Sequence, residues 1–168
     1  MWSRKTDVIG SCDLCSQSVT PSNLITNGSF EKGSSQTGLP SGWLTDEWQP
    51  TSIFTWDSSE AHTGSMSAKI FSPIPNDSRW ITTTSVQIQP NTLYSLSGWI
   101  KTDNIAATDQ SHEVANLSIY GTWTHTGGLT GTHDWTYKSL LFNSGSDTQA
   151  TIGARLGYWS AITTGCLV

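Results

Sequence analysis

Residues 93–101 show most clearly how hydrophobic and polar positions alternate along this chain. In this segment, LYSLSGWIK, Tyr94, Leu96 and Ile100 fall on one face of an extended strand, while two serines, a lysine and Trp99 fall on the other. Successive side chains of a strand point to opposite faces, so the pattern predicts a half-buried strand with a solvent face. A tryptophan on such a face has two interpretations. Either a neighbouring loop covers Trp99, or the face binds a ligand that stacks on the indole ring.

The same alternation recurs in short segments that are separated by Gly, Pro and Asn. The further predicted strands are residues 23–31, 51–56, 65–70, 80–88, 114–120, the residues after Trp135, and 150–157. The side chains expected to face the core are Met66, Ala68, Ile70, Leu117, Ile119, Leu140, Phe142, Ile152, Ala154 and Leu156. No segment keeps a helical period for more than a turn or two. Many short alternating strands predict an all-β fold, an antiparallel β-sandwich.

The length of 168 residues predicts one domain. Residues 1–22 show no periodicity and are interpreted as an N-terminal leader or linker, so the predicted domain covers residues 23–168. No apolar run follows the basic residues near the N-terminus, which is unlike a secretory signal. Two alternatives stay open: a signal was removed, or the segment comes from the interior of a longer polypeptide.

The composition narrows the class of partner. Only 12% of the residues are charged, the net charge is −5, and the eight Lys and Arg residues are scattered. Nucleic acids and anionic membranes are bound by clustered basic residues, so the sequence argues against both partners. No apolar window is long enough to span a bilayer. Few charges, many hydroxyl groups and nine tryptophans indicate a secreted, tryptophan-rich β-protein that meets neutral polar ligands.

The cysteines give little support for a zinc site. Cys12 and Cys15 form a single C-x-x-C, and neither Cys166 nor the histidines add two more ligands at a recognisable spacing. A disulfide or an unpaired tether is therefore favoured over a metal. The apolar neighbours of Cys166 predict a core position for it.

Six motifs occur in order over residues 23–168. They are NLITNGSFE (23–31), PSGW (40–43), HTGSMSAKI (62–70), VQIQPNTLYSLSGWIKTD (86–103), HDWTYKSLLF (133–142) and TIGARLG (151–157). In these motifs the chain resembles the carbohydrate-binding modules of families four, nine and twenty-two. The resemblance implies a jelly roll with a galactose-binding-domain-like shape. It also implies non-catalytic binding of a β-linked polysaccharide such as xylan or β-glucan, outside the cell or on a cell or virion surface, beside a partner such as a glycoside hydrolase domain.

A sugar site needs an aromatic plate for the ring face and polar groups for the hydroxyl rim. The residues predicted to point outward and to bind the ligand are Trp99, Tyr120, Tyr137, Gln87, Asn116 and Arg155. Loop tryptophans are expected to add walls, namely Trp48, Trp80, Trp123 and Trp159. For each residue taken singly, packing against a loop is the competing interpretation.

The resemblance also implies a structural calcium ion. Glu31 matches the family's carboxylate ligand, and the backbone carbonyls carried over are those of Ser29, Glu60 and Thr63. Gly165–Val168 matches only the start of the family's last strand, so the aspartate of that strand has no counterpart. The site is then weaker, or another segment or subunit completes the strand. The alternative for Glu31 is a solvated strand end.

Catalytic signatures are weak. The histidines form no H-x-H or H-E-x-x-H pattern, most acidic residues fall in predicted loops, and no serine has a nucleophile-elbow context. We therefore predict no catalytic residues and no enzymatic activity, which leaves a glycan-cleaving enzyme as the weakest hypothesis. The alternative to carbohydrate binding is a structural jelly-roll subunit of an extracellular filament, surface layer or phage tail. Such a subunit would self-assemble by strand exchange at its incomplete last strand.

Overall fold

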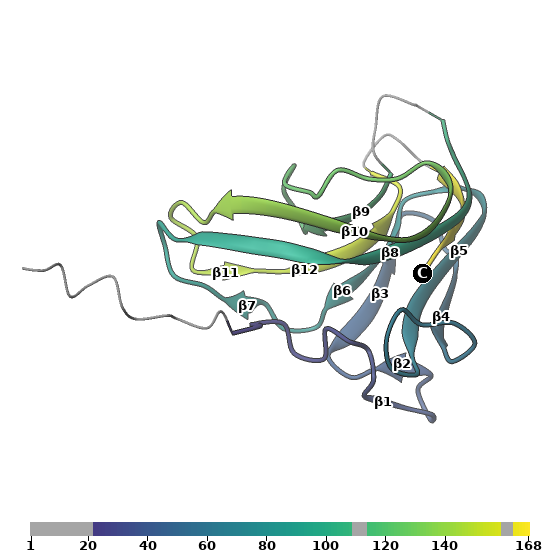
Figure 1. Cartoon of the computed structure of the whole chain (residues 1–168), viewed down its shortest axis with the longest axis horizontal. Coiled ribbons are helices and arrows are strands. Elements are labelled where there is room, and N and C mark those ends of the chain that lie inside the picture. The colour runs from purple at the N-terminus through teal and green to yellow at the C-terminus, as the bar shows by residue number, and fades with distance from the viewer. Residues whose placement is uncertain (1–21, 109–113, 159–162) are drawn as a thin grey trace, which may run out of the picture.

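The structure, a computed structural model, describes residues 22–108, 114–158 and 163–168, and it is built from strands (Figure 1). The strands are β1 (Gly33–Ser34), β2 (Leu39–Pro40), β3 (Trp43–Glu47), β4 (Ile53–Asp57), β5 (Ser67–Asn76), β6 (Ser78–Thr82), β7 (Val86–Gln87), β8 (Leu93–Ala107), β9 (Ala115–Ile119), β10 (Gly131–Asn143), β11 (Gln149–Ala150), β12 (Ile152–Leu156) and β13 (Thr163–Leu167). The described residues contain no helix, and so none that could cross a membrane. The all-β prediction is confirmed. The predicted leader lies outside the described residues, apart from residue 22.

Two main sheets form the sandwich. A five-stranded sheet has the order β10-β8-β13-β5-β4, and a four-stranded sheet has the order β3-β6-β12-β9. All of the strand pairs are antiparallel. Figure 1 shows β8 and β10 side by side along most of the length of the molecule. The crossovers between non-consecutive strands are those of a jelly roll, as the sequence predicts.

The core lies between the inner faces of the two sheets. Its fully buried side chains include Ile70, Trp80 and Leu156, and Ile100 of β8 is buried beside them. A second apolar cluster, with Leu96 at its centre, extends toward β7 and β11. The predicted inward faces of residues 65–70, 93–101 and 150–157 are therefore confirmed, because alternation places these residues on the covered side of each strand.

Three local predictions are wrong. The segment 23–31 forms turns instead of a strand, and Asn27 and Phe30 take left-handed backbone angles (φ 54° and 60°). Residues 80–88 divide between β6 and β7, and Trp80, expected in a loop wall, lies fully buried in the core. Cys166 is half-buried on the outer face of β13, where its neighbours in register are Phe71 and Asp103. Burial raises the pKa of its thiol. Cys12 and Cys15 lie outside the described residues.

The loop 121–130 folds back along the edge strand β9 of the four-stranded sheet. Single β-bridges join Leu129 to Ala115 and His125 to Ser118, and the backbone N–H of Thr126 donates to the carbonyl oxygen of Leu117 (2.9 Å). The loop therefore extends the four-stranded sheet beyond β9 by irregular pairing.

Candidate functional site

Two exposed aromatic side chains lie next to each other on the outer face of the five-stranded sheet. Trp99 of β8 and Tyr137 of β10 are direct cross-strand partners. They are 47% and 53% exposed, and their ring centroids are 5.4 Å apart with the planes at 58°. The prediction that both point outward is confirmed. The two tilted rings expose apolar surface, and an aromatic ring is a surface on which the C–H face of a sugar can stack.

The loop between β4 and β5 reaches the same place. His62 stacks on Trp99, with ring centroids 4.0 Å apart and planes at 14°, and Trp135 meets His62 edge-on at 5.6 Å. A loop residue thus covers part of Trp99, while nearly half of that side chain stays accessible. The interpretation that a loop covers Trp99 holds in part, because the ring is packed on one side and presents the remainder to solvent. Ligand binding at this face stays a prediction.

Glu31 holds this loop in position. Its carboxylate accepts hydrogen bonds from the backbone N–H groups of Ser65 and Met66 (3.1 Å). Gly64 has a φ of +76°, and a Cβ atom there would stand 2.3 Å from Glu31 Oε1, so only glycine allows the approach. The Ser67 hydroxyl donates to the carbonyl oxygen of Glu60 (2.6 Å). These bonds tie the loop that carries His62 to the segment before β1 and close its two ends.

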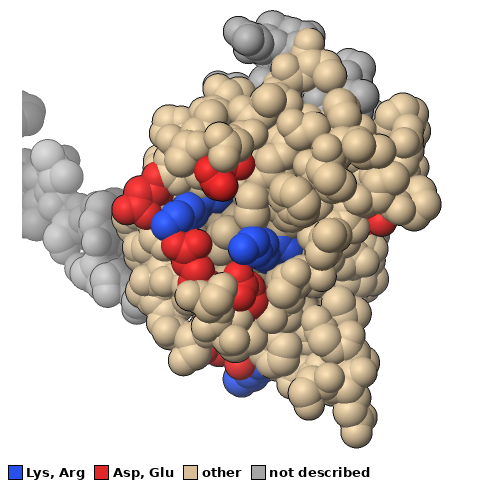
Figure 2. Space-filling view, turned by 90° about the vertical axis from the view of Figure 1, so that its right-hand side faces the viewer, with Lys and Arg blue, Asp and Glu red and all other residues tan. Residues whose placement is uncertain are grey.

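Charged groups border the aromatic cluster. Lys101, next along the outer face of β8, donates to the Glu60 carboxylate and lies 3.4 Å from Asp134 Oδ1. The hydrogen bond to Glu60 raises the pKa of Lys101. The pKa of Asp134 is lowered by the hydrogen bond from the backbone N–H of Trp135 and then by the nearby Lys101 ammonium group. On the side shown in Figure 2, basic and acidic side chains lie next to one another within a largely uncharged surface. The balanced charge suits a neutral ligand with hydroxyl groups.

The other four predicted ligand residues lie elsewhere. Tyr120 follows β9 at the opposite sheet, under the guanidinium of Arg79 at 5.1 Å, and Gln87 is exposed on the short strand β7. Asn116 and Arg155 are buried, with exposed fractions of 0% and 3%. The prediction that these two are exposed is wrong: Arg155 is enclosed by Asp77 and the ring of Tyr158, and Asn116 is its cross-strand neighbour on β9.

Arg155 belongs to a buried ion network on the four-stranded sheet. Its guanidinium donates to both carboxylate oxygens of Asp77, at 2.7 Å from Nε to Oδ1, and lies 4.6 Å from the ring centroid of Tyr158. Asp77 also pairs with Arg79 at 3.1 Å, and Arg79 pairs with Asp46. The network joins β3, β6 and β12 of the same sheet. It gives these side chains a structural role.

Two of the residues carried over for calcium, Glu31 and Glu60, bond to protein groups in this structure. Both oxygens of the Glu31 carboxylate accept backbone N–H groups, the Glu60 carbonyl accepts the Ser67 hydroxyl, and the Glu60 carboxylate pairs with Lys101. Ser29 and Thr63 line the cavity described below. Within the described residues, no three His, Cys, Asp or Glu side chains gather as metal ligands. Calcium binding stays a prediction.

We expect calcium to be revealed by thermal stability, if it binds at Glu31. An ion present at about 100 times its Kd stabilises the fold by about 2.7 kcal/mol. For a domain of this size, each kcal/mol raises Tm by about 2–4 °C, so the rise in Tm should be clear. The comparison is Tm in CaCl₂ against Tm in EDTA, with Glu31→Gln as the control. A rise that persists in Glu31→Gln comes from another site. Identical Tm values in the wild type reject the prediction.

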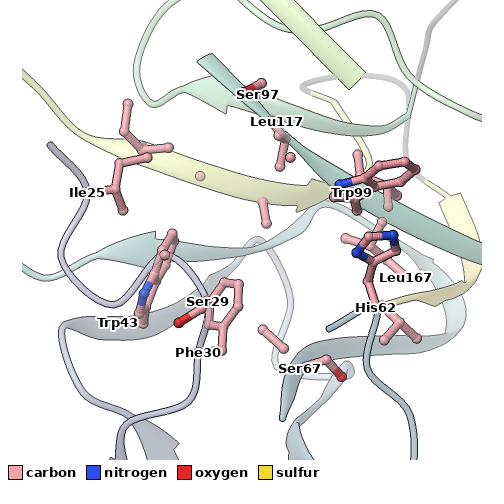
Figure 3. A pocket seen from close by; sticks show the side chains of 18 of the residues that line it. Ile25, Ser29, Phe30, Trp43, His62, Ser67, Ser97, Trp99, Leu117 and Leu167 are labelled. Atoms are coloured by element: carbon pink, nitrogen blue, oxygen red, sulfur yellow. The ribbon is translucent and has the colours of Figure 1, made fainter. Parts of the chain in front are cut away.

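An apolar cavity opens beside the aromatic cluster (Figure 3). Its volume is about 210 Å³. Trp99 and His62 lie on one side of it, across from Trp43 and Phe30, and Leu117 of the opposite sheet also lines it. The sequence offered no signal for this cavity, because its lining comes from segments that are far apart in the chain.

The sequence matches no protein-family model, and it matches no curated protein sequence. Solved structures resemble the chain at low sequence identity. One is a structure of a family 4 carbohydrate-binding module, with 19% sequence identity and a TM-score of 0.52. The match covers 85% of this chain and 93% of that one. Another is the enzymatically active domain of tailspike protein 4 from bacteriophage CBA120, with 15% sequence identity and a TM-score of 0.54. The match covers 86% of this chain but only 20% of that one. The chain therefore has the jelly-roll fold of carbohydrate-binding modules.

Proposed function

We propose that the outer face of the five-stranded sheet binds a neutral polysaccharide without cleaving it. The observation that carries the proposal is the pair Trp99 and Tyr137, exposed side by side and bordered by Lys101 and Asp134. Aromatic rings take the apolar face of a sugar ring, and charged or amide groups take its hydroxyls. The fold shared with carbohydrate-binding modules supports the same function. Within this class we propose a β-linked glycan such as xylan or β-glucan.

The charged groups at this face support binding over cleavage. A glycosidase needs a carboxylic acid with a raised pKa to protonate the leaving oxygen. The pKa of Asp134 is instead lowered, so this group is ionised at neutral pH and cannot serve as that acid. A low density of charge fits a protein that works outside the cell, near a cell wall or another glycan surface. A glycoside hydrolase is the partner that such a module would hold near its substrate.

Trp99→Ala is expected to weaken glycan binding by about 2 kcal/mol, or about 30-fold, as for the loss of a central contact residue. Tyr137→Ala should also weaken glycan binding. Thermal stability should change by less than about 0.5 kcal/mol, because nearly half of the Trp99 side chain is exposed. Affinity electrophoresis in gels that contain xylan, β-glucan or galactan measures the binding.

Leu141→Ala is the matched control. Leu141 is exposed on β10, four residues from Tyr137 on the same face, so its removal tests whether any apolar loss there weakens binding. Leu96→Ala is the opposite control, since it should cost about 2–5 kcal/mol of stability. Retardation of the wild type by none of the glycans rejects the function. Equal losses in Trp99→Ala and Leu141→Ala reject the site.

A further inference from the structure

The imidazole ring of His62 lies flat on the indole ring of Trp99. The two ring centroids are 4.0 Å apart and the planes differ by 14°, which is a stacked contact at van der Waals distance (Figure 3). Trp99 also meets Tyr137, but the planes of those two rings are tilted by 58°. The imidazole therefore makes the flat contact with Trp99 that a stacked sugar ring needs.

His62 belongs to residues 58–66, which join β4 to β5 and which we name the lid loop. The lid loop is fixed at both ends. Near β4, Ser59 donates its backbone N–H and its hydroxyl to the Asp57 carboxylate (2.8 and 2.7 Å). Near β5, the Glu31 carboxylate accepts two backbone N–H groups of the loop (3.1 Å). The base of the lid loop is therefore tied to the rest of the fold.

The tip of the lid loop, residues 61–63, is held in a different way. Among the described residues, none donates a hydrogen bond to the tip or accepts one from it. The ring contacts of the tip are the stack of His62 on Trp99 and the contact of His62 with Trp135, whose centroids are 5.6 Å apart. His62 and Thr63 are both exposed. An exposed tip without hydrogen bonds opens at a low cost in free energy while its base stays in place.

The position that the imidazole fills has the surroundings of a sugar-binding subsite. Trp99 provides a flat face, and the half-buried ring of Trp135 stands at 69° to the imidazole plane. Lys101 is the next residue along the same outer face of β8, and its ammonium group lies 3.4 Å from Asp134 Oδ1. An aromatic face, an aromatic side wall and polar groups nearby are what a ring bearing hydroxyls requires.

We propose that His62 occupies the position of a sugar ring on Trp99, and that the tip of the lid loop moves away when a glycan binds. This inference rests on the function proposed above and names a subsite of that glycan site. The sugar and the imidazole compete for one face of the indole, so only the open form of the lid loop binds at this subsite. The apparent affinity is then reduced in proportion to the fraction of molecules that are open.

His62→Ala removes the competing ring and should strengthen glycan binding by roughly 2- to 12-fold, the factor that a pair of aromatic rings contributes. His62→Phe keeps a ring on Trp99 and should bind no more tightly than the wild type. Ser58→Ala is the matched control, because it changes an exposed side chain of the same loop that carries no ring. Dissociation constants come from affinity electrophoresis in gels of increasing xylan, β-glucan or galactan content.

A second measurement tests the ring contact without any glycan. In proton NMR spectra, the ring current of Trp99 should shift the imidazole signals of His62 upfield, and His62→Ala identifies these signals by their loss. Trp99→Ala should return them to the positions of an exposed histidine. Signals that stay unchanged in Trp99→Ala overturn the proposal, because the two rings then do not stack in solution.

The inference and the proposed function fail in different ways. If none of the gels retards either the wild type or His62→Ala, the binding function is rejected, and the subsite with it. If the wild type is retarded and His62→Ala binds equally or more weakly, the function stands and the inference is overturned, because His62 is then a bystander or a fixed wall of the site. Equal gains in His62→Ala and Ser58→Ala overturn the inference as well.

Discussion

Asp77→Ala is expected to destabilise the fold by about 3–5 kcal/mol, the usual cost of removing one partner of a buried ion pair. Asp77 and Arg155 are 5% and 3% exposed, and the carboxylate takes two hydrogen bonds from the guanidinium. The substitution leaves a buried positive charge beside Arg79, which carries the same sign. Urea denaturation followed by circular dichroism measures the change as a lower midpoint at an unchanged slope.

Two controls test the origin of that loss. Asp46→Ala removes a carboxylate from the same network where it is one-third exposed, and exposed pairs contribute about 0–1 kcal/mol. The double variant Asp77→Asn with Arg155→Met removes both charges and should recover part of the loss, since no unpaired charge remains. If Asp77→Ala and Asp46→Ala cost the same, the buried pair is not the source. If the double variant is worse than either single change, the network stabilises beyond charge pairing.

The outward half of the candidate site could be predicted from local pattern alone. Trp99 interrupts a face of serines within a regular strand, and Tyr137 alternates with Leu140 and Phe142 closely enough to be placed opposite it. Period-two alternation is a local property that survives folding wherever pairing is regular. His62 and Trp135 were missed as site residues. Their positions depend on the loop that Glu31 holds and on the irregular pairing of β10 between His133 and Thr136.

Alternation determines which face a side chain takes, but it does not determine what covers that face. Arg155 and Asn116 lie on the outer face of their strands as predicted, yet both are buried. Arg155 is enclosed by Asp77 and by the ring of Tyr158, which also meets His125. Asp77 is far from Arg155 in the sequence, so no local period reveals this contact.

The segment 23–31 shows how a correct local signal can lead to a wrong element. Its Asn-Gly pair does form a turn, but the flanking residues bond to side chains and to other loops instead of to a strand. The side-chain amide of Asn27 donates to the backbone carbonyls of Lys32 and Ser41 (2.8 Å). The backbone carbonyl oxygen of Asn27 accepts the indole N–H of Trp43 (3.1 Å). An asparagine that satisfies several backbone groups can replace strand pairing.

Trp80→Ala is expected to cost about 3–5 kcal/mol of stability, the range for removing a large aromatic side chain from a core. Trp80 is fully buried, meets Phe54 edge-on with centroids 5.4 Å apart, and donates its indole N–H to the carbonyl oxygen of Lys69 (3.2 Å). Trp48→Ala is the matched control, because the same change at a 63% exposed position should cost less than about 0.5 kcal/mol. Urea midpoints give both values. Trp80→Phe keeps most of the ring volume but leaves the Lys69 carbonyl without its indole donor. Its loss of stability should therefore lie between the losses of Trp80→Ala and Trp48→Ala. A loss at Trp80 no larger than at Trp48 would place the centre of the core elsewhere and would contradict the packing of the two sheets described above.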